Sequence, residues 1–264
     1  MNRIDSRLFS RVKKNITPAV SYREVIGQDY LDSRSQYHTG SMILPIFTLT
    51  LEASNPLRFS IDELRSFFHK KSAEYTQLHK DSIPGFIHRY PVVQCKQIKG
   101  MLMVIGVGQG ADFLQEISGG VEAFRFGETT CRISGRDQEV RKQEFGISDE
   151  IHTYEFLTPW LALNQQNAKK FYDLKGKPER DAFMQKILTG HLSTLAKSID
   201  YELPAPLTCK SRVRFKRERI HQENVMVFLG TFGTNLTIPD YLGLGLSVSS
   251  GFGTIRCLVQ DPDH

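Results

Sequence analysis

Residues 43–145 carry strand and helix patterns in a fixed order, and this order restricts the fold more than any other feature of the chain. Alternating apolar and β-branched residues predict strands, whereas apolar residues spaced three or four apart predict helices. Lys99-Gly100 separates two short strand patterns and predicts a hairpin. The expected elements are strands at 43–53, 87–98, 101–107, 128–134 and 137–145, and helices at 60–78 and 111–117.

The order strand–helix–strand–strand–helix–strand is typical of a ferredoxin-like, or RRM-like, α+β domain with an antiparallel sheet. A second series of patterns begins after the composition changes at 146–150. Its expected elements are a strand at the start of 151–163, helices at 165–174 and 179–200, and strands at 209–219, 224–232 and 254–260. The sequence therefore predicts a polar extension at 1–42 and two ferredoxin-like domains in tandem, at 43–150 and 151–264.

The composition is that of a globular protein with a moderate positive charge. The chain has 264 residues, 40% of them hydrophobic, a net charge of +5 and a pI near 9.0. This charge favours acidic partners such as nucleic acid. The four cysteines lack zinc-ligand spacing, so we expect no metal and free thiols in a reducing cytoplasm. We expect neither a signal peptide, because residues 1–20 lack an apolar core, nor a membrane span, because no apolar run approaches ~18–20 residues.

A glycine pattern after the hairpin raises a dinucleotide-binding alternative. Gly106, Gly108 and Ala111 fit the spacing G-x-G-x-x-G/A. Glu128 follows roughly 20 residues later, where a Rossmann domain carries the acid that binds the ribose. However, the predicted helix is short and the flanking strands look antiparallel, whereas a parallel βαβ unit needs a longer crossover. We therefore expect a strand-to-helix turn that requires small residues, and no cofactor.

Residues 209–219, CKSRVRFKRER, combine a strand pattern with a row of cations. Because side chains alternate between the two faces of a strand, four cations share one face. They are Lys210, Arg212, Arg214 and Lys216. An anionic backbone lying across them would relieve their repulsion, which predicts nucleic-acid binding; ferredoxin-like domains and the lack of a DNA-binding motif favour RNA. The alternative is a solvated edge strand whose charges oppose aggregation.

A second glycine cluster, DYLGLGLSVSSGFGTI at 240–255, has four glycines within eleven positions. Glycines gather where the backbone approaches other atoms more closely than side chains allow. We expect Gly243, Gly245, Gly251 and Gly253 to bring backbone N–H groups close to RNA phosphates, beside the basic strand. The alternative is a tight loop packed between the two domains, shaped by glycine for folding alone.

Three stretches resemble the CRISPR repeat-processing endoribonucleases, the b-type branch within the repeat-associated mysterious protein superfamily. They are HRYPVVQCK at 88–96, YEFLTPWLALNQQN at 154–167 and IPDYLGLGLSVSSGFGTI at 238–255. The resemblance covers about residues 43–260, and its C-terminal glycine-rich loop is the most specific part. Some relatives carry a basic residue in this loop, where the chain has Leu246 and Ser250. This departure shifts the expected phosphate contacts toward the basic strand.

The resemblance implies metal-independent cleavage of CRISPR precursor RNA within each repeat. The 2′-hydroxyl attacks the adjacent phosphate and leaves a 2′,3′-cyclic phosphate and a 5′-hydroxyl. The family places its catalytic histidine in or just after the first helix, and His69, mid-helix, is expected to be solvated. The predicted roles are His79 as principal base or acid, Tyr90 as its hydrogen-bonding partner or second proton donor, Lys80 as the phosphate-stabilising cation and His88 as the rival of His79.

The expected partner is CRISPR repeat RNA, with no membrane partner. The resemblance further implies association with CRISPR effector subunits and, as in some relatives, a homodimer. The alternative function is a non-catalytic RNA-binding subunit of an effector complex. Such a subunit would keep the basic strand and the glycine-rich loop but would lack a working histidine and tyrosine.

Overall fold

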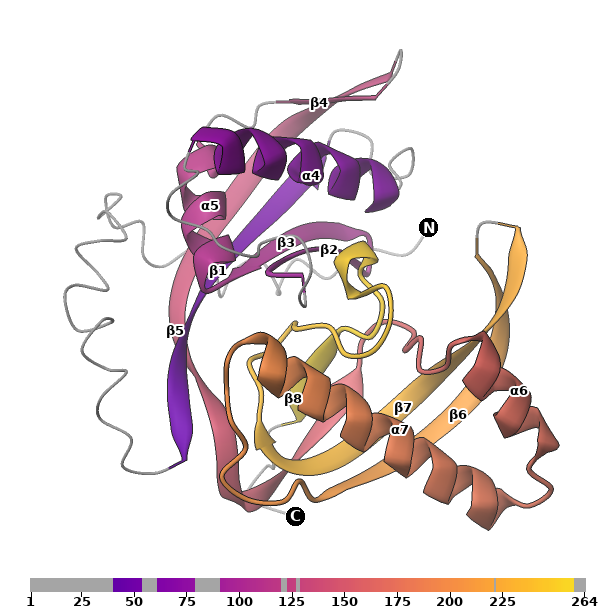
Figure 1. The fold of residues 1–264 in the computed structure, drawn as a ribbon. Coiled ribbons are helices and arrows are strands. Elements are labelled where there is room, and N and C mark those ends of the chain that lie inside the picture. The colour runs from indigo at the N-terminus through magenta and orange to yellow at the C-terminus, as the bar shows by residue number, and fades with distance from the viewer. Residues whose placement is uncertain are drawn as a thin grey trace. The chain divides into compact units, whose positions relative to one another are not determined.

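A computed structural model describes residues 40–53, 61–78, 91–119, 123–126, 129–220 and 222–258, all within a unit that spans Thr39–His264. The N-terminal half contains β1 (Ser41–Ala53), α4 (Ile61–Leu78), β2 (Val93–Ile98), β3 (Met101–Val107), α5 (Gln109–Ser118) and β4 (Ala123–Phe126) (Figure 1). β5 (Thr129–Phe156) leads into the C-terminal half. That half contains α6 (Gln165–Asp173), α7 (Lys177–Ser198), β6 (Cys209–Ile220), β7 (Glu223–Thr237), the 3₁₀ turn η3 (Val248–Ser250) and β8 (Ile255–Leu258).

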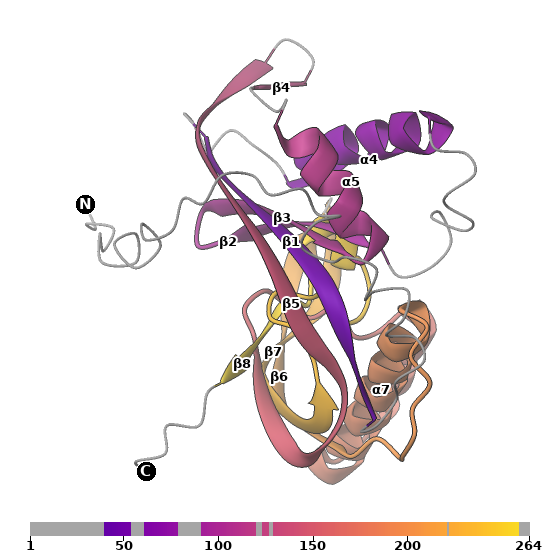
Figure 2. The same ribbon diagram turned by 90° about the vertical axis from the view of Figure 1, so that its left-hand side faces the viewer.

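The long strand β5 belongs to both halves of the sheet. The strand order is β2-β3-β1-β5 in the N-terminal half and β8-β5-β7-β6 in the C-terminal half, with every pair antiparallel. In each half the first strand lies between the third and the fourth, which is the split arrangement of a ferredoxin-like domain. β5 is the fourth strand of the first half and the first strand of the second, and Figure 2 shows it running from one half into the other.

One core lies between the N-terminal sheet and helices α4 and α5. Its apolar side chains include Leu49 and Val104 from the sheet and Leu114 from α5, all fully buried. Arg136 of β5 fixes the C-terminal end of α5, because its Nη1 donates to the carbonyl oxygens of Ser118 (3.1 Å) and Gly119 (2.8 Å). The negative end of the helix dipole favours a cation there.

A larger core fills the C-terminal half and continues onto the second face of the N-terminal sheet. Trp160 is fully buried at its centre and stacks on Phe156, with ring centroids 5.0 Å apart. The ring of His191, from α7, meets Trp160 edge-on at 5.6 Å. Burial lowers the pKa of His191 to about 4, so this histidine is neutral at pH 7. Phe145 of β5 belongs to the same core, so the two halves share packed side chains.

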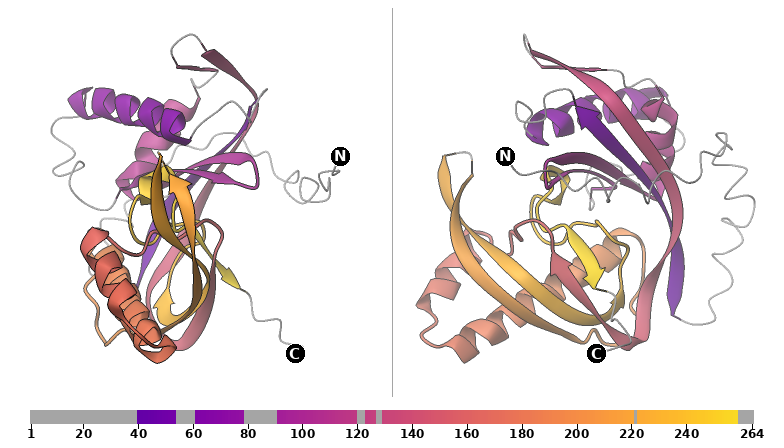
Figure 3. Two further views of the ribbon diagram at one scale, coloured as in Figure 1. Left: turned by 90° about the vertical axis from the view of Figure 1, so that its right-hand side faces the viewer. Right: turned by 180° about the vertical axis from the view of Figure 1, so that it is seen from behind.

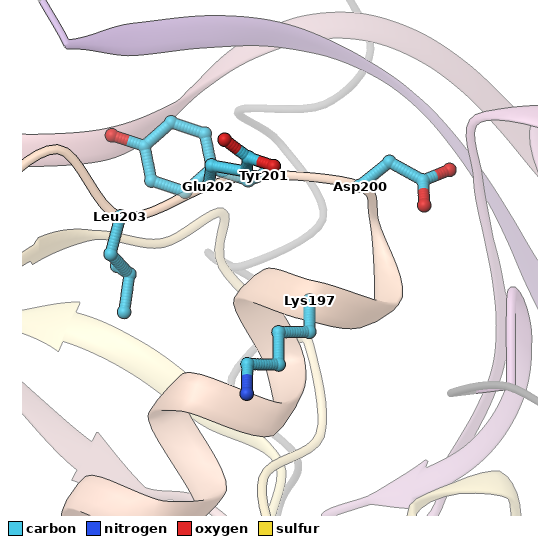
Figure 4. A pocket seen from close by; sticks show the side chains of 5 residues that line it. All are labelled: Lys197, Asp200, Tyr201, Glu202 and Leu203. Atoms are coloured by element: carbon cyan, nitrogen blue, oxygen red, sulfur yellow. The ribbon is translucent and has the colours of Figure 1, made fainter.

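A hollow of about 430 Å³ lies at the C-terminal end of α7 and is lined by Lys197, Asp200, Tyr201, Glu202 and Leu203 (Figure 4). The hydroxyl of Tyr201 accepts a hydrogen bond from the amide of Ile147 at 2.9 Å and donates one to the carbonyl of Gly40. Tyr201 therefore fastens the beginning of β1 and the middle of β5 to the end of α7.

The tandem ferredoxin-like fold predicted from the sequence is confirmed, as is the hairpin at Lys99-Gly100. The expectation of separate strands at 128–134, 137–145 and the start of 151–163 is wrong, because one strand, β5, spans all three. The boundary predicted between residues 150 and 151 falls inside this strand. Of the predicted extension, residues 1–39 lie outside the described residues.

Two glycines explain why the pattern suggested breaks in β5. A Cβ on Gly146 would lie 2.5 Å from the Cα of Ser41, and one on Gly135 would lie 2.6 Å from Oε2 of Glu52. Gly146 therefore serves close approach to the backbone of β1 rather than the end of a strand, whereas a side chain at Gly135 would displace only the flexible end of Glu52. Long-range pairing with β1 keeps the strand continuous here and overrides the local sequence signal.

The dinucleotide-binding alternative is excluded by the direction of β3, which pairs antiparallel with both β1 and β2. A Cβ on Gly106 would lie 2.1 Å from the carbonyl oxygen of Gly110 at the start of α5. This glycine therefore permits close packing between strand and helix.

Candidate functional site

The glycine-rich loop, residues 238–254, joins β7 to β8 and docks on the N-terminal half (Figure 1). The amide of Gly243 donates to Oε1 of Gln94 in β2 at 2.9 Å. On the α4 side, Nη1 of Arg65 donates to Oγ of Ser250 at 3.0 Å, and that hydroxyl lies 3.4 Å from Oδ1 of Asp62. The loop is thus held by a strand and a helix of the other half.

The four glycines of the loop all face protein atoms. A Cβ on Gly243 would lie 2.5 Å from Val248 Cβ, and one on Gly245 would lie 2.5 Å from Trp160 Nε1. A Cβ on Gly251 would lie 3.0 Å from the carbonyl oxygen of Cys95. A Cβ on Gly253 would lie 2.0 Å from the carbonyl oxygen of Leu244. Gly245 and Gly253 also have positive φ, at 99° and 62°, where a side chain adds strain. Packing therefore accounts for the glycines, and their contact with RNA stays a prediction.

A buried polar pair on β2 supports the docked loop. Lys96 is completely buried, and its Nζ donates to Oε1 of Gln94 at 2.8 Å, the same oxygen that accepts the amide of Gly243. Nε2 of Gln94 donates to the carbonyl of Pro91 at 3.1 Å. Burial lowers the pKa of Lys96 to about 7, because desolvation disfavours the ammonium form. Gln94 thus links the loop, the buried lysine and Pro91.

The cations predicted on one strand lie on β6, and we call Lys210, Arg212, Arg214 and Lys216 the β6 cations. All four are exposed. The intervening residues Val213 and Phe215 turn toward the helices: Val213 packs on the core, and the ring of Phe215 lies 5.5 Å from that of Phe171 in α6. The β6 cations therefore occupy the sheet face that α6 and α7 leave uncovered. Lys216 also forms an ion pair with Glu218.

The uncovered face continues across the sheet with mixed charge. Arg212 pairs in register with Thr231, Thr231 with Glu155, and Glu155 with Arg256 of β8. Nε of Arg256 donates to Oε1 of Glu155 at 3.0 Å. The unbalanced positive charge of this face is therefore concentrated on β6, its outer strand.

The four predicted catalytic residues, His79, Lys80, His88 and Tyr90, lie outside the described residues. The chain enters this segment at Leu78, the last residue of α4, and leaves it at Pro91, whose carbonyl accepts from Gln94. Both flanking elements, α4 and β2, also contact the glycine-rich loop. The catalytic roles stay predictions.

Neither a metal cluster nor a membrane span is present in the part of the chain that the structure describes. Its His, Cys, Asp and Glu side chains form no group of three or more suited to a metal ion. None of its helices is long and apolar enough to cross a bilayer.

The fold and the docked loop define a protein of two ferredoxin-like halves fused through one strand. Models of the Cas6b N-terminal domain and the Cas6b C-terminal domain match residues 42–144 and 146–258. The chain belongs to the Cas6b family. It is also 31% identical, over 133 residues, to an uncharacterized protein of Methanocaldococcus jannaschii, a match that covers 47% of this chain and 84% of that protein.

Solved structures agree with this assignment. A crystal structure of Cas6b is 28% identical with a TM-score of 0.69. A second crystal structure, of the CRISPR RNA processing endoribonuclease Cas6b, is 29% identical in sequence to this chain and superimposes on it with a TM-score of 0.66. Each match covers 82% of this chain and 100% of the other. The resemblance noted from the sequence is therefore confirmed at the level of the family.

Sequence reasoning missed the roles of Gln94 and Lys96, although a signal was present. In the strand VQCKQI they share one face by alternation, and two polar residues on a strand face of a buried hairpin indicate a specific polar contact. Nothing in the sequence indicated that their partner would be Gly243, because 149 positions separate the two hydrogen-bonded residues.

Replacing Gly253 with alanine is expected to lower the free energy of unfolding by about 2–4 kcal/mol. The new methyl group would collide with the carbonyl oxygen of Leu244, and alanine would have to adopt a positive φ. Urea denaturation measures this loss. Gly190 in α7 is the control, because nothing lies within 4 Å of its Cβ position. There alanine should stabilise the helix by about 0.5–1 kcal/mol. Equal effects at the two positions would contradict the packing argument.

Proposed function

We propose that the protein is an endoribonuclease that cleaves CRISPR precursor RNA within its repeats. The observation that carries this proposal is the match, over 82% of the chain, to the CRISPR RNA processing endoribonuclease Cas6b. The exposed β6 cations add support, because a row of cations on an open sheet face suits a polyphosphate backbone.

The proposed reaction is an internal transfer at phosphorus that needs no metal ion. A general base removes the proton of the 2′-hydroxyl, the 2′-oxygen bonds to the adjacent phosphorus, and the 5′-oxygen leaves. A general acid protonates that oxygen, so the products are a 2′,3′-cyclic phosphate and a 5′-hydroxyl. We assign His79 as base or acid with His88 as its rival, Tyr90 as partner or second proton donor, and Lys80 as the cation that stabilises the phosphorane-like charge.

The β6 cations would hold the RNA backbone, and the glycine-rich loop would set the position of the catalytic segment. Support for the second role comes from the loop's two contacts, one with α4 through Arg65 and one with β2 through Gln94. These elements flank the segment that carries the four assigned catalytic residues. Direct contact between the loop backbone and RNA phosphates stays part of the proposal.

The test is cleavage of a labelled repeat RNA from the organism's own CRISPR array, in EDTA, beside the same RNA with one 2′-deoxy nucleotide at the cut position. We expect cleavage of the first and complete survival of the second, because the 2′-oxygen is the nucleophile. Cleavage of both would contradict the mechanism. Tight binding without cleavage would instead favour a non-catalytic RNA-binding subunit.

A further inference from the structure

An exposed aromatic ring stands beside β6 on the face opposite the β6 cations. Tyr172 of α6 is 47% exposed. The residue before it, Phe171, is buried and packs edge-on against Phe215 of β6 and Phe228 of β7, at 5.5 and 5.6 Å. Asn164 caps the helix, with its Oδ1 accepting from the amide of Asn167 at 2.8 Å. Tyr172 is therefore exposed to solvent on a firmly anchored helix, and Figure 3 shows α6 and α7 together on one side of the β6–β7 hairpin.

Arg217 of β6 reaches this ring. Its Nε donates to the hydroxyl of Tyr172 at 3.2 Å, and its guanidinium carbon lies 5.5 Å from the ring centroid. By strand alternation Arg217 is on the helix side of β6, away from the β6 cations. An arginine and an aromatic ring held together at the surface form the pair that stacks on a nucleobase and contacts its phosphate.

The surroundings of the pair are positively charged. Lys169 lies one turn before Tyr172 on α6 and is exposed, as are Lys170 and Lys175. Arg219 is exposed two residues beyond Arg217, on the same face of β6. The acids on α6, at the start of α7 and on β6 are Asp173, Glu179, Asp181 and Glu218, fewer than the cations, and Glu218 pairs with Lys216 on the opposite face of β6. This balance favours an anionic ligand.

The distal part of the β6–β7 hairpin allows one strand of RNA to reach both faces. β5 pairs with β7 only from Thr231 to Thr237, so the hairpin residues before Thr231 extend beyond β5. Within the described residues, β6 pairs with β7 alone, and its outer edge has no neighbouring strand. Nucleic acid lying on the β6 cations therefore needs to pass only this edge to reach Tyr172.

We propose that Tyr172 and Arg217 form a second RNA subsite, which stacks an unpaired nucleotide adjoining the RNA segment held by the β6 cations. The ligand is single-stranded, because a base inside a duplex is already stacked and offers no free face. The subsite rests on the proposed RNA-processing function and extends it from backbone binding to base stacking.

The experiment measures the affinity of the full chain for two probes. One is single-stranded repeat RNA made uncleavable by 2′-deoxy substitution, and the other is the same strand annealed to its full complement. Tyr172→Ala should weaken binding of the single strand by about 5- to 100-fold and leave duplex binding unchanged, since stacking on one aromatic is worth that much. Tyr172→Phe, which keeps the ring, should retain the affinity. Ile43→Ala, at a residue of β1 that is 54% exposed, is the control and should change neither.

Arg217→Gln gives an independent readout: the slope of log affinity against log salt should fall by about 0.7 for the single strand. The subsite is overturned if Tyr172→Ala binds the single strand like the wild type, or if it loses affinity equally for both probes. Wild-type protein that binds neither RNA overturns the proposed function itself. Thermal unfolding confirms that each variant is folded.

Discussion

Replacing the β6 cations with glutamine is expected to weaken the binding of uncleavable repeat RNA by about 10²–10³-fold near 0.1 M salt, because each phosphate contact releases a condensed counterion. The slope of log affinity against log salt should fall by about 3 for single-stranded RNA. The fold should tolerate the change, since all four side chains are exposed. Filter binding at several salt concentrations measures both quantities.

The control removes the same charge elsewhere, by glutamine at the exposed residues Lys99, Lys142, Lys186 and Lys197. This variant has the same net charge, so it tests whether the effect belongs to the row on β6 or to the total charge of the protein. Its affinity should fall by less than about 10-fold, because scattered charges are screened at this salt. Equal losses would contradict a local binding face. Aggregation of the β6 variant with unchanged RNA affinity would favour the edge-protection alternative.

The fold was largely predictable because its signals are local. The turn at Lys99-Gly100 and the apolar periods of α4 and α7 follow from neighbouring residues, and these specify the order of elements. The continuity of β5 was not predictable in this way. Its exposed stretch from Arg136 to Lys142 is held by register with β1, a partner about ninety residues away. Local patterns also gave no sign that one strand would serve both halves.

For the candidate site as well, local patterns predicted some features, and others required the structure. Alternation on β6 placed the four cations on one face because a strand has a period of two. The loop glycines were recognised as unusual, but two of their neighbours, Trp160 and the backbone of Cys95, come from distant segments that only folding brings to the loop. The pairing of Tyr172 with Arg217 likewise joins a helix and a strand 45 positions apart. Periodicity predicts faces, whereas partners across the fold require the structure.

His79→Ala is expected to reduce the single-turnover rate of repeat cleavage by about 10²-fold or more, which is the usual loss when a general acid or base is removed. Affinity for uncleavable RNA should stay close to that of the wild type, because binding is assigned to β6. The readout is therefore a fall in the rate at saturating enzyme with an unchanged dissociation constant. A loss confined to affinity would make His79 a binding residue instead.

His69→Ala is the matched control, since this histidine is exposed on α4, ten positions before His79 in the sequence. Its rate should stay within about threefold of the wild type, a change well below the loss expected for an acid or base.

His88→Ala decides between the two rival assignments. If His79 is the principal group, the His88 variant keeps most of the activity; if the losses are reversed, the catalytic histidine is His88. Wild-type rates in both His79→Ala and His88→Ala would contradict the histidine mechanism and would assign the proton transfers to Tyr90 and Lys80.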